Sequence, residues 1–93
     1  MARILKTDGT LHDLKGEDPK GRLTMAQMRQ AVGGYVCVVK LSGDKMQMVV
    51  DVDADWKNVP VNRTATEMYR RNSGYMGVVI KGDVILCAYR SLK

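Results

Sequence analysis

The stretch that decides the fold runs from Tyr35 to Val52 and reads YVCVVKLSGDKMQMVVDV. Its first part is rich in β-branched residues, which favour a strand, and the Ser-Gly-Asp-Lys sequence at residues 42–45 is typical of a turn. The returning part places Met46, Met48, Val50 and Val52 on one face and Gln47 and Asp51 on the other. A period of two residues is that of a strand with one buried face, so the stretch predicts an antiparallel hairpin.

Two further hairpins are expected on either side of this one. Each consists of two strand-like runs joined by a turn: residues 2–6 and 11–14 around Asp8-Gly9, and residues 77–80 and 84–89 around Lys81-Gly82-Asp83. An Asp-Gly pair between two such runs is a strong hairpin signal.

Two helices are expected between the hairpins. The first follows Thr24, because Thr24 and Gln27 have the spacing of a capping box, and it ends at a pair of glycines. The same spacing at Thr64 and Glu67 predicts a second helix over residues 65–71.

These elements follow one another in the order ββαββαββ. Runs of strands with two inserted helices predict an α+β fold: a small, mainly antiparallel sheet with both helices on one face. The 93 residues are expected to form a single domain, residues 1–93. At this size burial of apolar surface barely exceeds the entropy cost of folding, so we expect a homo-oligomer.

The net charge of +5 favours nucleic acid, phosphorylated ligands or acidic protein surfaces as partners. Lys and Arg are spread along the chain, however, which is typical of a solvated surface. The sequence shows no signal-peptide pattern and no apolar stretch of about 18 residues. We therefore expect a cytoplasmic protein without membrane contact.

No motif predicts a metal or a cofactor. Cys37 and Cys87 lie in apolar runs without further Cys or His nearby, so we expect small buried side chains rather than a zinc site. Residues 51–55 resemble the start of a calcium loop, but Trp56 and Asn62 stand where that loop needs Gly and Glu.

Catalysis is also not indicated. His12 is the only histidine, and no nucleophile motif accompanies it. We expect His12 to be an exposed strand residue, and a small hydrolase that uses His12 or a carboxylate is the least favoured function.

The most suggestive polar segment is residues 58–66, where a proline turn precedes the expected second helix. Helix N-termini attract anions because their first backbone N–H groups lack partners. We predict ligand contacts by Asn62, Arg63, Thr64 and Thr66, with Arg70 further along the helix and Tyr35 as a wall. The alternative is ordinary helix capping, with Arg63 bound to a nearby carbonyl or carboxylate.

The glycines and tyrosines have simpler interpretations. Gly33-Gly34 ends a helix rather than beginning one, so it is expected to be a C-cap instead of a phosphate loop. Tyrosines at positions 35, 69, 75 and 89 could stack on bases, but basic and aromatic residues do not alternate as in RNA-binding motifs. We expect them at sheet edges or at a subunit interface.

Three segments together resemble a known family: Gly33-Gly34-Tyr35-Val36, Pro60-Val61-Asn62-Arg63 and Gly82-Asp83-Val84. The chain resembles the family called domain of unknown function 3846 from residue 4 to residue 87. It departs from the family at residues 70–73, where a more acidic, strand-like stretch is usual. The resemblance implies a small accessory protein of phages or bacterial mobile elements that acts on host defence or host metabolism, without implying a mechanism.

The leading hypothesis is therefore a non-catalytic phage or mobile-element accessory protein that acts by binding, including counteraction of host defence. Its partner would be a host protein or a small anionic, nucleotide-like ligand, and no cofactor is expected. Nucleic-acid binding is the alternative, and a small hydrolase is third.

Overall fold

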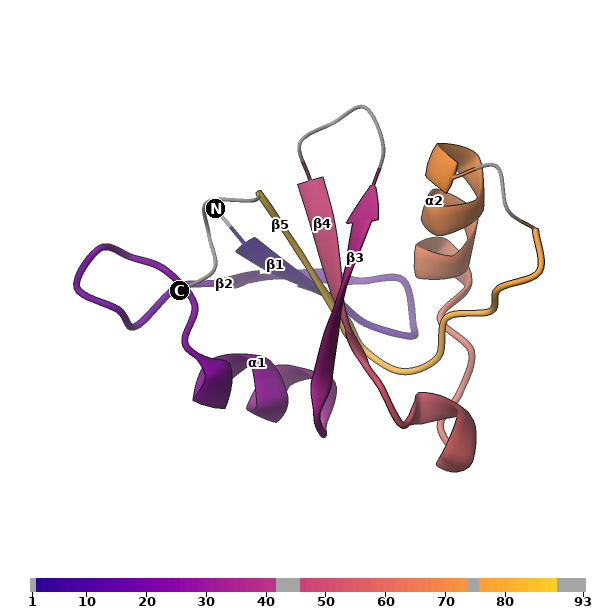
Figure 1. Ribbon diagram of the computed structural model, residues 1–93, viewed down its shortest axis with the longest axis horizontal. Helices are drawn as coiled ribbons and strands as arrows, with labels where there is room; N and C mark the ends of the chain where they lie inside the picture. The colour runs from indigo at the N-terminus through magenta and orange to yellow at the C-terminus, as the bar shows by residue number, and fades with distance from the viewer. Residues whose placement is uncertain (1, 42–45, 74–75, 89–93) are drawn as a thin grey trace.

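A computed structural model describes residues 2–41, 46–73 and 76–88. Its strands form a five-stranded antiparallel sheet in the order β2-β1-β5-β4-β3 (Figure 1). The elements are β1 (Ala2–Leu5), β2 (Leu11–Leu14), α1 (Met25–Val32), β3 (Val36–Leu41), β4 (Met46–Asp51), the short 3-10 helix η1 (Ala54–Trp56), α2 (Arg63–Ser73) and β5 (Val84–Ala88). The expected α+β class is confirmed.

Two of the expected hairpins are present. β1 pairs with β2 from Ala2 to Leu5, and Gly9 takes a φ of 89° in the turn between them, a conformation that only glycine adopts cheaply. β3 pairs with β4 over its whole length. The turn expected at residues 42–45 lies outside the described residues.

The expected third hairpin is wrong. Residues 76–80 form no strand, and β5 lies in the middle of the sheet between β1 and β4, so the observed order is ββαββαβ. The backbone of Ile80 is bound elsewhere: its N–H donates to Thr66 Oγ1 (2.9 Å), and its carbonyl accepts from the Asn62 N–H (2.8 Å). Residues at the start of α2 therefore take the hydrogen bonds that a neighbouring strand would have made.

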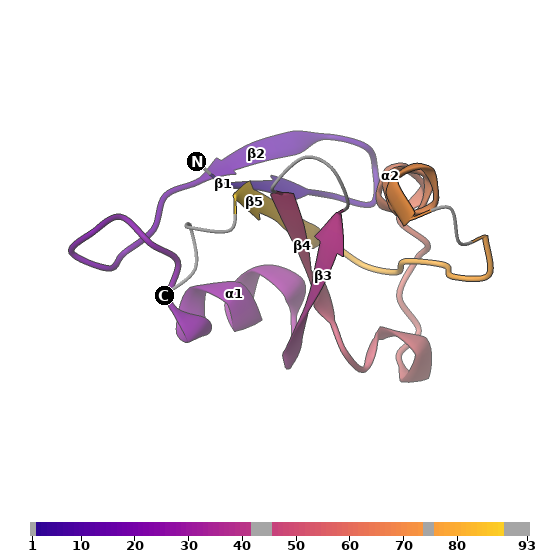
Figure 2. The same cartoon turned by 45° about the horizontal axis from the view of Figure 1, so that its top comes forward.

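The two helices cover opposite faces of the sheet, which corrects the expectation of one covered face (Figure 2). Side chains alternate along a strand, so Met48 and Val49 point to opposite sides. Val49 packs in a cluster with Met28 and Val32 of α1, whereas Met48 packs in a cluster with Ala65 of α2. The central strands β4 and β5 are thus buried on both sides, as their nearly continuous apolar sequences require.

The first helix begins and ends as predicted. Thr24 Oγ1 accepts from the Gln27 N–H (3.2 Å), Gln27 Oε1 accepts from the Thr24 N–H (3.1 Å), and Gly33 ends the helix with a φ of 87°. The Gln27 amide also donates to the carbonyl of Lys15 (2.7 Å). Gln27 therefore holds the loop before α1 as well as the first turn of the helix.

The two cysteines have different environments. Cys87 is fully buried on the α1 face, and burial raises the pKa of its thiol. Cys37 is exposed on β3, so the expectation that both are buried is wrong for Cys37. Cys37 pairs with Val50, which packs on the α2 face, so the two free thiols lie on opposite sides of the sheet.

Candidate binding site

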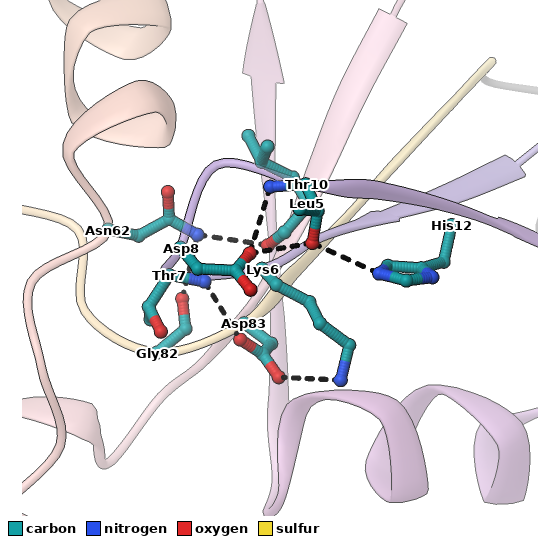
Figure 3. Close-up of polar contacts among 9 residues, drawn as sticks. All are labelled: Leu5, Lys6, Thr7, Asp8, Thr10, His12, Asn62, Gly82 and Asp83. Atoms are coloured by element: carbon teal, nitrogen blue, oxygen red, sulfur yellow. Dashed lines mark hydrogen bonds and ion pairs between the residues drawn. The ribbon is translucent and has the colours of Figure 1, made fainter.

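Asn62 is the centre of the corner where the sequence predicts a ligand. It is 0% exposed. Its Nδ2 donates to the carbonyls of Leu5 (2.9 Å) and Gly82 (3.0 Å; Figure 3), and its Oδ1 accepts from the Ala65 N–H (3.1 Å). One amide side chain therefore joins the end of β1, the turn before β5 and the first turn of α2.

Asn62 is also the residue that caps α2. A side-chain oxygen that accepts from the N–H three residues on is the usual N-cap arrangement. The helix consequently begins at Arg63, and the capping box expected at Thr64 and Glu67 is wrong.

Thr66 is the second buried polar side chain of this corner. Its Oγ1 lies 2.8 Å from the Asn62 carbonyl and 3.2 Å from the Ile80 carbonyl, and it accepts from the Ile80 N–H. A hydroxyl has one proton, so Thr66 donates to one of these carbonyls at a time. The polar atoms of Asn62 and Thr66 thus serve the fold, and a ligand here would depend on the other predicted residues.

Those other residues are on the surface. Arg63 and Thr64 are exposed on the first turn of α2, and the turn of the β1–β2 hairpin lies against it: a Cβ added to Gly9 would be 3.9 Å from Thr64 Oγ1. Arg70 donates from Nε to the carbonyl of Val78 (3.3 Å). Arg63, Thr64 and Arg70 therefore share α2, with Arg70 directed toward the segment after the helix.

The ring of Tyr35 lies against α1. This residue follows the C-terminus of α1, and its ring is 4.6 Å from the guanidinium carbon of Arg29 in a cation–π contact. Tyr35 is 62% exposed and directly precedes β3. It was predicted as a wall of the corner at Asn62, but its observed contact is with α1.

An exposed chain of hydrogen bonds runs along the β1–β2 hairpin (Figure 3). Thr10 Oγ1 donates to Asp8 Oδ1 (2.6 Å) and lies 3.0 Å from His12 Nε2. The bonds from the Thr10 side chain and then from its backbone lower the pKa of Asp8, which makes this carboxylate a weaker base. Because the Thr10 proton is directed to Asp8, Nε2 of His12 can bond to this hydroxyl only in the tautomer in which it carries a proton. His12 is exposed, as predicted.

A polar groove of about 400 Å³ lies between α1 and the β1–β2 hairpin. Two of its lining residues already have internal partners. Asp83 accepts from the Thr7 N–H (3.1 Å) and is 3.9 Å from Lys6 Nζ, and Gln27 binds the loop before α1. These contacts hold parts of the fold together, so Asp83 and Gln27 have a structural role in the groove.

A cavity of different character, about 310 Å³ in volume, opens between β3, β4 and α2, and we call it the β3 cleft. Its lining is mainly apolar and includes Cys37, Val39, Val50, Val52, Tyr69 and residues 78–80. The charged residues in the lining are Asp51 and Lys81. An apolar cleft with few polar groups is suited to burying side chains of a partner.

Three apolar side chains just before β3, after β4 and in η1 are exposed. We call these side chains the Trp56 surface: they are Tyr35 (62% exposed), Val52 (53%) and Trp56 (89%). The Val52 N–H donates to the Tyr35 carbonyl (2.9 Å), and Val52 also lines the β3 cleft. Cleft and surface are therefore continuous at Val52.

An ion pair fixes the chain directly after Trp56. Lys57 Nζ is 2.7 Å from the buried carboxylate of Asp51 and donates to the Gly33 carbonyl (3.1 Å). A Cβ added to Gly34 would lie 2.5 Å from Lys57 Nζ and 3.0 Å from Asp51 Oδ1. The glycine pair thus ends α1 as predicted and also leaves room for this ion pair, which the sequence did not indicate.

Fold and site together define a small α+β protein with an apolar cleft beside an edge strand. The chain belongs to the family described as Domain of unknown function (DUF3846), whose model matches residues 4–91. The predicted family membership is confirmed. No curated protein and no solved structure gives a significant match. Within the described ranges, no helix is long and apolar enough to cross a membrane.

Sequence reasoning had not selected Trp56 as a functional residue. In the sequence, Trp56 stands out only as a departure from a calcium loop, and a lone tryptophan either packs inward or faces a partner. Exposure distinguishes the two cases, and exposure depends on how η1 sits on the fold. The residue type was therefore the only signal available in the sequence.

Proposed function

We propose that the protein acts without catalysis, by binding another protein through the Trp56 surface. The observation that carries this proposal is the 89% exposure of Trp56. Trp and Tyr are enriched among the residues that dominate binding energy at protein interfaces. Because the neighbouring Lys57 is bound to Asp51 and Gly33, Trp56 is presented from an ordered backbone, which reduces the entropy cost of binding.

The partner in this proposal is a host protein that is inhibited when it is bound. The resemblance to small accessory proteins of phages and mobile elements supports a role in counteracting host defence. Such a role would be performed in the cytoplasm. A nucleotide-like ligand is less well supported, because Asn62 and Thr66 are buried and hydrogen-bonded within the fold.

Nucleic acid is the alternative partner, favoured by the contact of Arg29 with the exposed ring of Tyr35 and by the net charge of +5. This alternative predicts that affinity falls steeply and log-linearly with salt concentration, since each neutralised phosphate releases counterions. A protein interface centred on Trp56 predicts a shallow dependence on salt. Binding measured at several salt concentrations therefore separates the two.

The direct test is capture of a partner from a bacterial lysate treated with nuclease. We expect the unmodified protein to retain a specific protein that Trp56→Ser loses. Met25→Ser is the matched control, because Met25 is also an exposed apolar residue (52%) but lies on α1. Equal capture by Trp56→Ser and the unmodified protein would contradict the proposal.

A further inference from the structure

β3 is an edge strand, and half of its backbone groups point away from the sheet. The Val52 N–H donates to the Tyr35 carbonyl, so Tyr35 and Val52 form a hydrogen-bonded pair. In an antiparallel ladder such pairs alternate along the strand. The N–H and C=O groups of Val36 and Val38 are consequently directed outward, away from β4.

Edge strands are often protected by proline, bulges or several charges, and β3 has little of this protection. Its sequence is VCVVKL, with one charged residue and no proline. It pairs with β4 without interruption. A regular, largely apolar edge of this kind is a template for a further strand.

The β3 cleft lies where side chains of such a strand would point. An added strand would lie about 4.8 Å from β3, with every second side chain on the α2 face. Cys37 and Val39 point to that face and line the cleft. Among the strands, α2 has its main contacts with β3, and it packs on the face of the sheet to which Met48 points. The opposite wall of the cleft includes Val79, which is 43% exposed.

The charge of the chain favours a negatively charged occupant. Arg70 is bound next to the cleft at Val78, and the net charge is +5. The carboxylate of Asp51 is neutralised by Lys57. Opposite charges across neighbouring strands are stabilising and like charges are not. A second copy of this chain, with its own charge of +5, therefore fits less well than an acidic segment.

We infer that β3 binds an extended, acidic segment of the partner protein as an additional antiparallel or parallel strand. Small apolar side chains of that segment occupy the β3 cleft, and its carboxylates complement the positive net charge of this chain. Backbone hydrogen bonds to Val36 and Val38 supply affinity, while the cleft supplies selectivity. This inference rests on the proposed protein-binding function and specifies how the partner is recognised.

A synthetic peptide of alternating valine and glutamate, long enough to pair with the six residues of β3, tests the inference directly. We expect NMR titration to shift the signals of β3 and of residues 78–80. At saturation, hydrogen exchange of the Val36 and Val38 amides should slow by about tenfold or more. A peptide with lysine in place of each glutamate should bind about tenfold more weakly. A peptide whose backbone nitrogens facing β3 are methylated cannot donate hydrogen bonds to β3 and should not bind.

The matched protein variants are Val38→Pro and Asp13→Pro. Each removes an N–H that points outward from an edge strand, which is β3 for Val38 and β2 for Asp13. Lys6 and Thr10 form a hydrogen-bonded pair next to β2, and because such pairs alternate along the strands, the Asp13 N–H points away from β1. Proline is tolerated at such positions. Val38→Pro should abolish peptide binding, and Asp13→Pro should preserve it.

Three results would overturn the inference: equal binding of the lysine peptide, peptide-induced shifts confined to β2, or a solution dimer that buries β3. Lysate capture separates this inference from the function proposed above. If Val38→Pro retains a partner that Trp56→Ser loses, protein binding stands and strand addition fails. If the peptide binds at β3 but Trp56→Ser captures the same partner as the unmodified protein, the Trp56 interface fails and strand addition stands.

Discussion

At the scale of single residues, the Asn62 side chain makes hydrogen bonds to three separate parts of the fold. A planar amide offers two donors and an acceptor, a combination that Asp, Ser and Thr lack. The sequence indicated that polar groups meet at this corner to bind a ligand, and that ligand stays a prediction. The sequence could not show that these groups are satisfied internally, because the carbonyls of Leu5 and Gly82 are 57 and 20 positions away along the chain.

Removal of the Asn62 amide should be costly. Asn62→Ala removes a donor from the carbonyls of Leu5 and Gly82 and leaves α2 without its cap, so we expect the free energy of unfolding to fall by about 3 kcal/mol. Urea denaturation measures this loss. The neighbouring exposed residue supplies the control: Arg63→Ala should change stability by less than about 0.5 kcal/mol. Similar losses for both variants would mean that the buried amide is not the stabilising group.

Gly34 offers a second prediction at this scale. In Gly34→Ala the new Cβ displaces Lys57 from Asp51, and we expect a loss of about 2 kcal/mol in the free energy of unfolding. In a Lys57→Met background the ion pair is already absent, so the same Ala should cost only about 0.5 kcal/mol. Denaturation of the unmodified protein, the two single variants and the double variant completes a double-mutant cycle. If the two losses of free energy simply add, the ion pair is not the reason that residue 34 must be glycine.

At the scale of elements, residues 76–80 show where sequence reasoning failed. Gly77-Val78-Val79-Ile80 has the composition of a strand, and composition was a fair guide to an extended, partly buried segment. Whether it pairs depends on the partner, and here the Thr66 hydroxyl and the Asn62 backbone bind Ile80 instead. The hairpins at β1–β2 and β3–β4 were predictable because their turns and alternation are local in sequence.

Thr66→Val tests this account of the segment. Valine has nearly the same shape as threonine but no hydroxyl, so the Ile80 N–H loses its acceptor. We expect a loss of about 1–3 kcal/mol in unfolding free energy and faster hydrogen exchange at the Ile80 amide. Thr64→Val, on the exposed side of α2, should change neither quantity. Unchanged exchange at Ile80 in Thr66→Val would show that the segment is held by other contacts.

At the scale of the whole molecule, the order of the expected strands and helices predicted the α+β class but not the arrangement of layers. Alternation assigns residues to two faces of a strand, and it does not say which helix covers which face. The near-continuous apolar sequences of β4 and β5 were the available sign that both faces are covered. The expected homo-oligomer stays a prediction, and a mass measurement in solution tests it.

The two thiols report on the opposite faces of the sheet. We expect Cys37 to react with a thiol reagent at the rate of an accessible cysteine, whereas Cys87 should react about a thousandfold more slowly, because its exposure requires global unfolding. Burial raises the pKa of Cys87 and slows the reaction further, since the thiolate is the reactive form. Mass spectrometry after timed labelling distinguishes the sites, and equal rates would contradict the packing of β5.

The central position of β5 has a consequence for how the protein is made. β5 is the last described strand along the chain, yet it joins β1 to β4 (Figure 1). During translation, the two N-terminal hairpins therefore emerge without the strand that connects them. The nascent chain exposes unpaired edges on β1 and β4 until residues 84–88 leave the ribosome, so assembly of the sheet waits for β5.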